Sequence, residues 1–579
     1  MARIMCWLNY RRNHVGQGTI SVPSPYDSNP GTPYWYDKLA SMANQLASNG
    51  ITDVLFPNPL IGEGAEAPTM DGYSVFDDYD IGSKGKNTRF GNAEQLRRAI
   101  AVFHANGINV HLDHIMHQRS GGWDGIYQYH NWDHSNKTLN GRFAKQPGCF
   151  RGAPPRVPAD PVPSPADDFA FGDELCPVNA LPKNYVWDGL LAAGDWLFRT
   201  TGADGARLDD MKGINLGFIK AFMTDPRYVM QHKFFFGEYA SGAINDLEWW
   251  INQVNRRASL IDFDFHYNFA QPMCMAASSG NFYMGNLANA GFRNIDPLKV
   301  VPFVESMDSD TNGFATIIFN KILGYALLLT GEGLPMIYIR DYLAEPDCYG
   351  LAPAINNLCW IHQKFAAGPT ITRYRSSRVF VFERQADPGL IVALNNDVWN
   401  PNWYSVTVTT DWPPGTIIHD YTGKNSQDCQ VDNNRNITFG VPPGVNGEGY
   451  GCWAPAGYSG NMTRPAGRVT TQVFFGAEDL DIPPININPI TVGRLWCATG
   501  SKLSANLKLL TGSTPSTVSF TVVDPNNLSQ TFPADVALNF PVSKTGWHSL
   551  IITGNGFTTS QRIPFELTVN YLATTRLPL

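Results

Sequence analysis

The stretch GARLDDMKG (residues 205–213) starts with a short strand-like run, GARL, which leads directly into two aspartates. It follows VWDGLLAAGDWLFRTTG (186–202), in which apolar residues recur every three or four positions and a glycine closes the run. This periodicity predicts a helix with a glycine C-cap, and the run after it predicts a buried strand. The pair therefore predicts one helix-to-strand step of an α/β fold.

The same step repeats along residues 1–368. Strand-like runs lie at 4–9, 51–57, 108–115, 205–210, 233–238, 259–265, 300–306 and 334–339. Helix-like runs such as 35–50, 93–107 and 312–333 lie between them. Eight strands that alternate with helices predict a (β/α)₈ barrel, and a doubly wound sheet is the alternative. The length and the number of strands favour the barrel.

Three further regions depart from this alternation. Residues 119–180 are rich in Gly, Pro, Asp and Trp, and they predict an irregular subdomain inserted after the third strand. From about residue 370, apolar residues alternate at period two, which predicts an antiparallel β-sandwich over 369–458. After a linker at 454–467, a second β-rich unit over 465–579 is expected to be immunoglobulin-like or carbohydrate-binding.

The composition excludes some classes of function. The formal net charge of −8 disfavours nucleic acid as a ligand, because phosphate binding requires a basic surface. The longest apolar stretch is interrupted by Glu332 and glycines, so we expect no membrane span. Without a signal-peptide core we expect a cytoplasmic enzyme, or a secreted one if a leader has been removed. The nine cysteines are interpreted as mostly reduced thiols, with a Cys429–Cys452 bridge as an option for an exported protein.

Three carboxylates end strand-like runs, namely Asp209, Glu238 and Asp308 on the fourth, fifth and seventh strands. In a barrel these strand ends converge on one cleft. Retaining cleavage of a glycoside needs an ionised carboxylate as nucleophile and a protonated carboxyl as acid. Arg207 lies two residues before Asp209, on the same face of the strand, and its guanidinium is expected to keep Asp209 ionised at neutral pH. Partial burial after the run FFFG is expected to raise the pKa of Glu238.

The segments LDHIMHQ (112–118), GARLDDMKG (205–213), FFFGEYA (234–240) and FVESMDSD (303–310) resemble the four conserved regions of the α-amylase family of glycoside hydrolases. Residues 72–91, 330–343 and 358–368 are similar to further segments of that family, and the resemblance covers about residues 3–458. It implies an α-glucan substrate. It also implies that Asp209 is the nucleophile, Glu238 the acid and base, and Asp308 the residue that stabilises the distorted sugar.

The resemblance implies roles for further residues as well. Arg207 would orient Asp209, Asp113 would support the site, Tyr73 would stack on the sugar, and Lys212 would reach a downstream sugar. The family's first region usually ends in Asn-His, where this chain has His117 and Gln118, and its fourth region usually has His where this chain has Met307. Gln118 can still donate and accept a hydrogen bond to the sugar, whereas Met307 makes that wall more apolar.

Calcium is the cofactor that the resemblance suggests. The family's first-region Asn is commonly a calcium ligand, and His117 is a poor ligand for a hard cation. Acidic residues of the insertion keep a calcium site open, with a solvated acidic loop as the other interpretation; they are Asp160, Asp167, Asp168 and Asp173. His111, His114 and His117 resemble a metal-binding set, but 111 and 114 point to opposite faces of a strand, which disfavours a shared metal.

Three functions remain open at this stage. The first is a retaining glycosidase acting on α-1,4-linked glucans, and the second is a transglycosylase that passes the same intermediate to a sugar. The third is a glycan-binding protein with a weakened site. The aromatic residues of the insertion either line sugar subsites or pack the loop; they are Trp123, Tyr127, Tyr129 and Trp132. The oligomeric state is not predicted.

Overall fold

The structure is a computed structural model. It describes residues 3–9, 35–62, 72–73, 75–83, 87–119, 142–164, 173–279, 282–310, 315–345, 348–476, 485, 489–510, 514–559, 561 and 563–577. Within these ranges, no helix has the length and apolar character needed to cross a membrane.

Eight strands form one sheet, in the order β11-β10-β9-β8-β5-β2-β1-β12. Their bounds are Met5–Trp7 (β1), Asp53–Phe56 (β2), Asn109–His114 (β5), Gly205–Leu208 (β8), Phe234–Gly237 (β9), Ser259–Asp262 (β10), Val300–Pro302 (β11) and Met336–Tyr338 (β12). The two outer strands meet at a parallel bridge between Phe303 and Met336, which joins the ends of the sheet. The predicted (β/α)₈ barrel is confirmed, and each observed strand lies inside a predicted run.

Helices alternate with these strands. They are Trp35–Ser48 (α1), Ala93–Ala105 (α2), Tyr185–Thr201 (α3), Leu216–Thr224 (α4), Ile244–Gln253 (α5), Gln271–Ser279 (α6), Lys321–Thr330 (α7), Ile339–Tyr342 (α8) and Ala352–Phe365 (α9). Asn92 and Gln95 form a capping box at the start of α2, and Gly202 ends α3 with a φ of 75°. Helix α7 begins at Lys321, later than the predicted run from 312, because Asn320 before it adopts a left-handed conformation.

By contacts, the chain divides into two compact units. The first includes β1, Ser48–Val54 and Phe236–Arg464, and the second includes α1 up to Ala47, Leu55–Phe235 and Pro465–Leu579. This division follows contacts rather than the order of the chain. The predicted domain limits of 1–368, 369–458 and 465–579 therefore stay a prediction.

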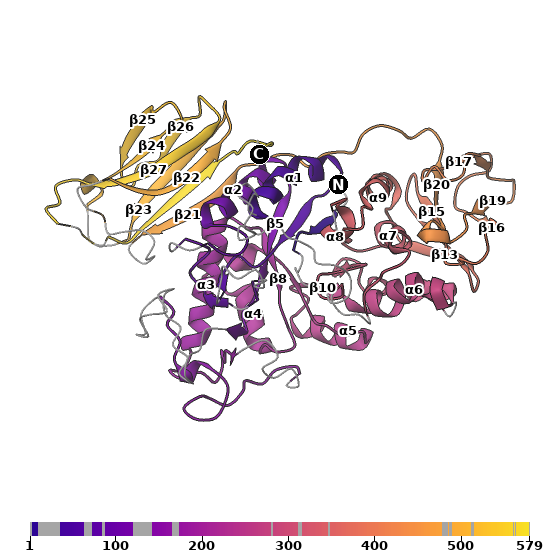
Figure 1. The fold of residues 1–579 in the computed structure, drawn as a ribbon, viewed down its shortest axis with the longest axis horizontal. Coiled ribbons are helices and arrows are strands. Elements are labelled where there is room, and N and C mark those ends of the chain that lie inside the picture. The colour runs from indigo at the N-terminus through magenta and orange to yellow at the C-terminus, as the bar shows by residue number, and fades with distance from the viewer. Residues whose placement is uncertain are drawn as a thin grey trace. The chain divides into compact units, whose positions relative to one another are not determined.

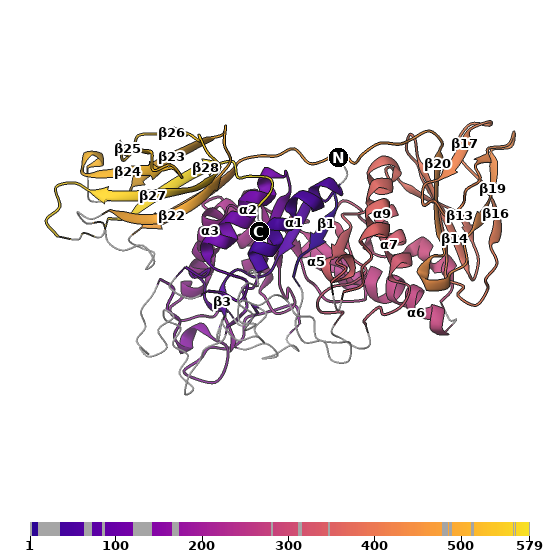
Figure 2. The same ribbon diagram turned by 45° about the horizontal axis from the view of Figure 1, so that its top comes forward.

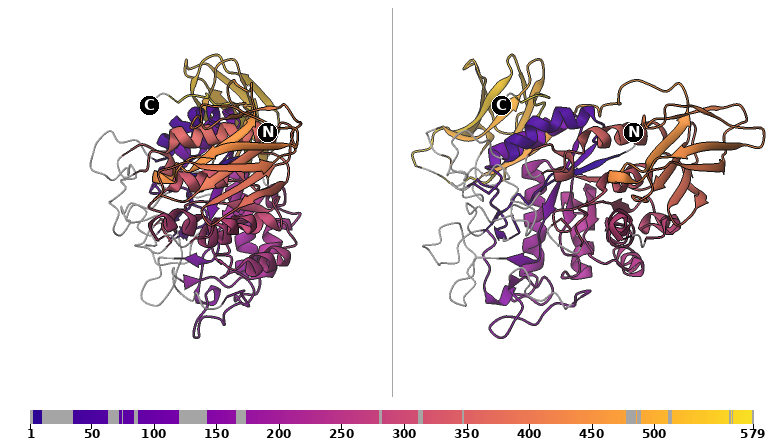
Figure 3. Two further views of the ribbon diagram at one scale, coloured as in Figure 1. Left: turned by 90° about the vertical axis from the view of Figure 1, so that its right-hand side faces the viewer. Right: turned by 45° about the vertical axis from the view of Figure 1, so that its right-hand side comes forward.

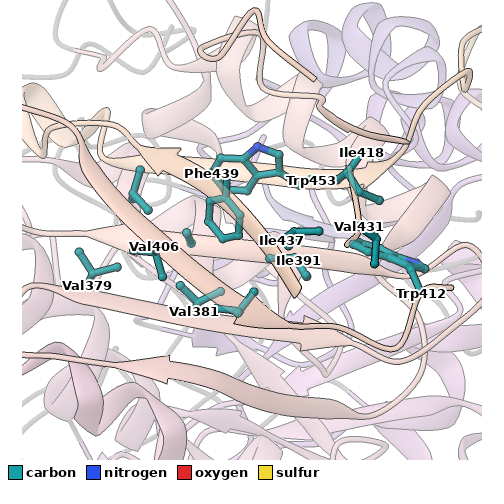
Figure 4. Packing of buried hydrophobic residues seen from close by; sticks show 13 residues of the cluster. Val379, Val381, Ile391, Val406, Trp412, Ile418, Val431, Ile437, Phe439 and Trp453 are labelled. Carbon is teal, nitrogen blue, oxygen red and sulfur yellow. The ribbon is translucent and has the colours of Figure 1, made fainter. Parts of the chain in front are cut away.

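The first unit contains an antiparallel sandwich, drawn in orange in Figures 2 and 3. Its large sheet has the order β13-β14-β15-β20-β17-β18, and β16 pairs with β19. These strands are Thr370–Arg375 (β13), Val379–Arg384 (β14), Leu390–Asn395 (β15), Tyr404–Thr409 (β16), Ile417–Asp420 (β17), Cys429–Gln430 (β18), Asn436–Val441 (β19) and Tyr450–Pro455 (β20). The period-two residues of both sheets form one apolar core, in which the rings of Phe439 and Trp453 lie 4.3 Å apart (Figure 4).

The second unit contains another sandwich, made of two four-stranded antiparallel sheets. Their orders are β21-β28-β23-β26 and β22-β27-β24-β25. The strands are Thr470–Gly476 (β21), Ile490–Cys497 (β22), Lys502–Leu509 (β23), Val518–Val523 (β24), Ser529–Pro533 (β25), Leu538–Pro541 (β26), Gly546–Gly554 (β27) and Phe565–Tyr571 (β28). Figure 1 shows these strands in yellow, beside α2 and α3.

This terminal sandwich packs directly on barrel helices. Arg199 of α3 makes a bidentate ion pair with Glu566 of β28, at 3.0 and 2.6 Å. The ring of His104 on α2 lies 2.8 Å from the Thr470 hydroxyl. A Cβ on Gly202 would lie 2.3 Å from the carbonyl oxygen of Thr471, so the two backbones approach closely. We call this junction the sandwich–helix interface.

The insertion is anchored by a short antiparallel pair, Gln118–Arg119 (β6) with Asp173–Glu174 (β7). Trp123, Tyr127, Tyr129, Trp132, Asp167 and Asp168 lie outside the described residues. All nine cysteines are free thiols. The optional Cys429–Cys452 bridge is therefore wrong for this structure: Cys429 pairs with Ile418 and Cys452 with Val392, on different strand pairs.

Candidate active site

The candidate nucleophile lies at the end of β8. Strands β5 and β8 are parallel, and their register places Asp113 opposite Arg207. Nη1 of Arg207 donates to Oδ1 of Asp113 at 2.6 Å and to Oδ1 of Asp209 at 2.8 Å. All three side chains are buried. One guanidinium thus bridges two carboxylates, and Arg207 and Asp209 share a face of their strand as expected.

Two neutral side chains complete this group, which we call the Arg207 cluster. The hydroxyl of Tyr73 donates to Oδ2 of Asp113 and accepts from Arg207 at 3.3 Å. Nε2 of Gln118 donates to Oδ2 of Asp209 at 3.2 Å. The structure therefore brings together Asp209 and four of the predicted binding residues. Lys212 lies on the following turn and is half-buried, and its carbonyl oxygen accepts from the backbone N–H of Ser164 at 3.1 Å.

The pKa of Asp209 is raised, whereas the sequence-based expectation was that Arg207 would favour the ionised carboxylate. Burial raises the pKa of Asp209 to about 6, and the charges of Asp113 and Asp210 act in the same sense, while Arg207 and Gln118 oppose them. Arg207 alone does not hold the pKa at the usual value of an aspartate.

The residue after Asp209 has an unusual backbone. Asp210 adopts a φ of 43°, in the left-handed region that aspartate tolerates better than most residues. This turn directs its side chain toward His117, whose Nδ1 lies 3.2 Å from Oδ2 of Asp210. Nε2 of His117 lies 3.5 Å from Oε1 of Glu174 on β7. His117 therefore faces two carboxylates instead of contributing to the Arg207 cluster.

The residues around His117 do not fit the calcium ion that the resemblance suggests. Arg151 pairs with Glu174 at 2.7 Å, and Arg156 pairs with Asp173 at 2.8 Å. Asp160 accepts the backbone N–H groups of Val178 and Asn179. Among the residues that the structure describes, no group of three or more His, Cys, Asp or Glu side chains could hold a metal ion. The ring of His114 stacks on Phe222, with centroids 5.3 Å apart.

The two other candidate carboxylates belong to the first unit. Glu238 follows β9 and Asp308 follows β11, and both side chains are half-buried. Burial raises the pKa of the Tyr267 phenol, and the negative charges of Asp308, Glu238 and Glu305 raise it further. The phenol therefore senses the charges of both candidate carboxylates. Sequence reasoning missed Tyr267, because it stands in the apolar run FHYNFA with no motif around it.

Met307 and Asp308 lie on a turn that is held by hydrogen bonds between its own residues. The side chain of Met307 is fully buried, and its sulfur accepts from Nδ2 of Asn9 at 3.1 Å. The backbone N–H of Asp308 donates to the Ser306 hydroxyl at 3.2 Å. Beneath this turn, Nζ of Lys321 lies 3.1 Å from Oε2 of Glu305 and 2.7 Å from Oδ1 of Asp341. We call Glu305, Lys321 and Asp341 the Lys321 cluster. It was not predicted, because its members lie far apart in the chain.

Comparisons with known proteins agree with this fold. The family described as "Alpha-amylase C-terminal" matches residues 390–454. An α-amylase of Geobacillus stearothermophilus is 25% identical over 483 residues, which is 72% of this chain and 84% of the relative. The structure of a Geobacillus thermoleovorans α-amylase complexed with acarbose has a TM-score of 0.55 at 15% identity, and covers 79% of this chain and 99% of its own. A γ-cyclodextrin glucanotransferase of alkalophilic Bacillus clarkii has a TM-score of 0.56 at 18% identity, and covers 99% of this chain and 97% of its own.

Proposed function

Because the chain belongs to the α-amylase family, as a distant homologue of bacterial α-amylases and cyclomaltodextrin glucanotransferases, we propose that it hydrolyses α-1,4-glucosidic bonds with retention of configuration. Its substrates would be starch- or glycogen-type glucans and maltooligosaccharides. The observation that supports this most is the Arg207 cluster, in which a guanidinium holds the Asp209 carboxyl at the end of a barrel strand. The acarbose complex of a similar α-amylase fold is consistent with an α-glucan ligand.

The proposed reaction has two displacements. In the first, a carboxylate oxygen of Asp209 bonds to the anomeric carbon while the bond to the leaving oxygen breaks, and Glu238 gives its proton to that oxygen. In the second, Glu238 takes a proton from water, which attacks the anomeric carbon and releases Asp209. Asp308 would bind the sugar hydroxyls in both steps, and Arg207 would hold Asp209 in place. Tyr73, Gln118, Lys212 and Met307 are proposed as substrate-binding residues.

The second candidate function is transfer of the glycosyl group to another sugar. The observation that favours it is the fold of the γ-cyclodextrin glucanotransferase, which covers 99% of this chain including the terminal sandwich. Fold alone does not separate the two activities, because they share the intermediate and differ only in the acceptor. A glycan-binding protein with a weakened site is less well supported, since the Arg207 cluster has both of its carboxylates and its cation.

Product analysis distinguishes these functions. Purified protein is incubated with soluble starch and with maltoheptaose, and the products are resolved by length and by anomeric form. We expect new reducing ends that are initially in the α-configuration. Chain lengths that redistribute without new reducing ends would instead identify a transferase. Retained starch binding without any product would contradict both enzymatic functions.

A further inference from the structure

His117 occupies a junction between two parts of the second unit. It follows β5, while its two carboxylate partners come from the turn after β8 and from β7 of the insertion. The backbone fixes this arrangement, because the N–H of Leu175 donates to the carbonyl oxygen of His117 at 2.9 Å. The ring is buried, with 5% of its surface exposed. A single side chain therefore connects Glu174 of the insertion to Asp210, the neighbour of Asp209.

The ring is closely enclosed by the turn that carries Asp210. A Cβ on Gly213 would lie 2.6 Å from Cε1 of His117 and 2.7 Å from Oδ2 of Asp210. Such distances leave no space for a side chain at position 213, so Gly213 is required for the ring to reach its partners. The contact between His117 and Asp210 is thus built into the shape of the turn.

The charges at this junction balance without a metal ion. Asp210 and Glu174 supply two negative charges, and Arg151 supplies one positive charge at 2.7 Å from Glu174. Burial alone would lower the pKa of His117, but Asp210 and Glu174 outweigh it and raise the pKa to about 9. The imidazolium is therefore the second positive charge at neutral pH. A divalent cation added here would leave an excess of two positive charges in a buried site.

We propose that the imidazolium of His117 takes the role of a metal ion at this junction: it ties the insertion to the turn beside Asp209 and makes the junction independent of calcium. His117 is then a positioning residue, since it acts through Asp210 and touches neither substrate nor nucleophile. This proposal concerns the stability of the folded chain and does not depend on the reaction proposed above. Thermal unfolding therefore tests it separately from catalysis.

The test compares the full-length protein with His117→Asn in EDTA and in millimolar CaCl₂. An asparagine keeps the size of the side chain but not its charge, and with Asp210 and Glu174 it offers three oxygen ligands that suit calcium. We expect the Tm of the wild-type protein to be the same in both solutions. His117→Asn should lose a few degrees in EDTA and recover part of this loss in CaCl₂, because a ligand that binds only the folded state stabilises it.

His114→Asn is the matched control, because His114 ends β5 three residues before His117, is also 5% exposed and stacks its ring on Phe222. Its loss of Tm should not respond to calcium. A rise of the wild-type Tm in CaCl₂ that His117→Asn abolishes would overturn the proposal. So would a His117→Asn variant with the Tm of the wild-type protein.

The pH dependence gives a second readout that loss of packing alone would not produce. The charged groups around His117 are Asp210 and Glu174, with Arg151 beside Glu174 and Asp160 lining the same cavity. Because the pKa of His117 is higher in the folded state than in the unfolded state, its contribution is complete below about pH 6.5 and is lost as the pH rises through about 9. The Tm difference between wild type and His117→Asn should therefore shrink over this interval. For His114→Asn, whose ring has a pKa lowered to about 4 by burial, the difference should stay constant.

Discussion

The Arg207 cluster and the Lys321 cluster are built from the same kinds of side chain but have different surroundings. Each places one buried cation between two carboxylates, with a tyrosine hydroxyl bonded to one of them. In the Lys321 cluster the carboxylate oxygens also accept from Ser309 and from the backbone N–H of Ile317, and Asp341 is fully buried. Asp209, by contrast, ends a barrel strand and keeps 6% of its surface exposed.

This difference shows that a buried ion pair does not by itself identify a catalytic group. Burial raises the pKa of Glu305 to about 7, as it raises that of Asp209 to about 6. The shifts are similar, so the pKa alone does not separate Asp209, at the end of a barrel strand, from Glu305, which lies inside a hydrogen-bonded turn. From their positions we propose that the Arg207 cluster takes part in the chemistry and that the Lys321 cluster supports the 305–310 turn. The following variants test this division, from the largest expected effect to the smallest.

Asp209→Asn should lower the turnover of maltooligosaccharides by about 10⁴-fold, because the amide cannot form the glycosyl intermediate. Stability should not fall, since the variant removes one of the three carboxylates near a single guanidinium. Initial rates and Tm values measured on the same preparation check both statements. Asp225→Asn, at the end of α4, is the control, and an Asp209→Asn variant with wild-type rates would reject the catalytic assignment.

Lys321→Met should lower the free energy of unfolding by about 3–5 kcal/mol, because it leaves Glu305 and Asp341 buried without their cation. Urea denaturation measures this loss. Adding Glu305→Gln to the same variant removes one of the stranded charges and should restore part of the stability. If Lys321→Met were as stable as the wild-type protein, the cluster would have no supporting role.

Gln118→Leu should lower kcat/KM by about 10- to 100-fold, which corresponds to the loss of one hydrogen bond to a charged group. It should also move the acid limb of the pH–rate profile. In the wild-type protein this limb should fall near pH 6, where Asp209 becomes protonated and cannot act as nucleophile. Because Gln118 lowers the pKa of Asp209, its removal should shift the limb to higher pH. Gln146→Leu, a half-buried position in the insertion whose side chain bonds the carbonyl oxygen of Leu181, should change neither quantity.

Arg494→Ala should change the free energy of unfolding by less than about 1 kcal/mol. Its ion pair with Glu94 is bidentate, at 3.0 and 2.9 Å, but the side chains of Arg494 and Glu94 are 48% and 29% exposed to water. This variant removes a more exposed ion pair, and its effect is the reference for the two buried clusters. Chemical denaturation in low and high salt measures it, and a loss as large as that of Lys321→Met would show that burial is not the deciding factor.

The sequence predicted the barrel well because its signals are local. Periodicity, terminal glycines and apolar runs marked the strands and helices, and the charged residues at strand ends marked Arg207 and Asp209. The partners of His117 could not be predicted, because Glu174 reaches it through an irregular insertion that has no periodic pattern. The direction of the pKa shift of Asp209 depended on how deeply the strand end is buried, which composition and spacing do not state.

The sandwich–helix interface also has a consequence for synthesis of the chain. His104 and Thr470 are 366 residues apart, and Arg199 and Glu566 are 367 residues apart. Helices α2 and α3 therefore leave the ribosome long before the strands that cover them. Contacts between residues that are so far apart in the chain form late. Until they form, the faces of α2 and α3 stay uncovered, and nascent chains aggregate through uncovered apolar surface. The strands of the terminal sandwich thus cover faces of α2 and α3 that are translated several hundred residues earlier.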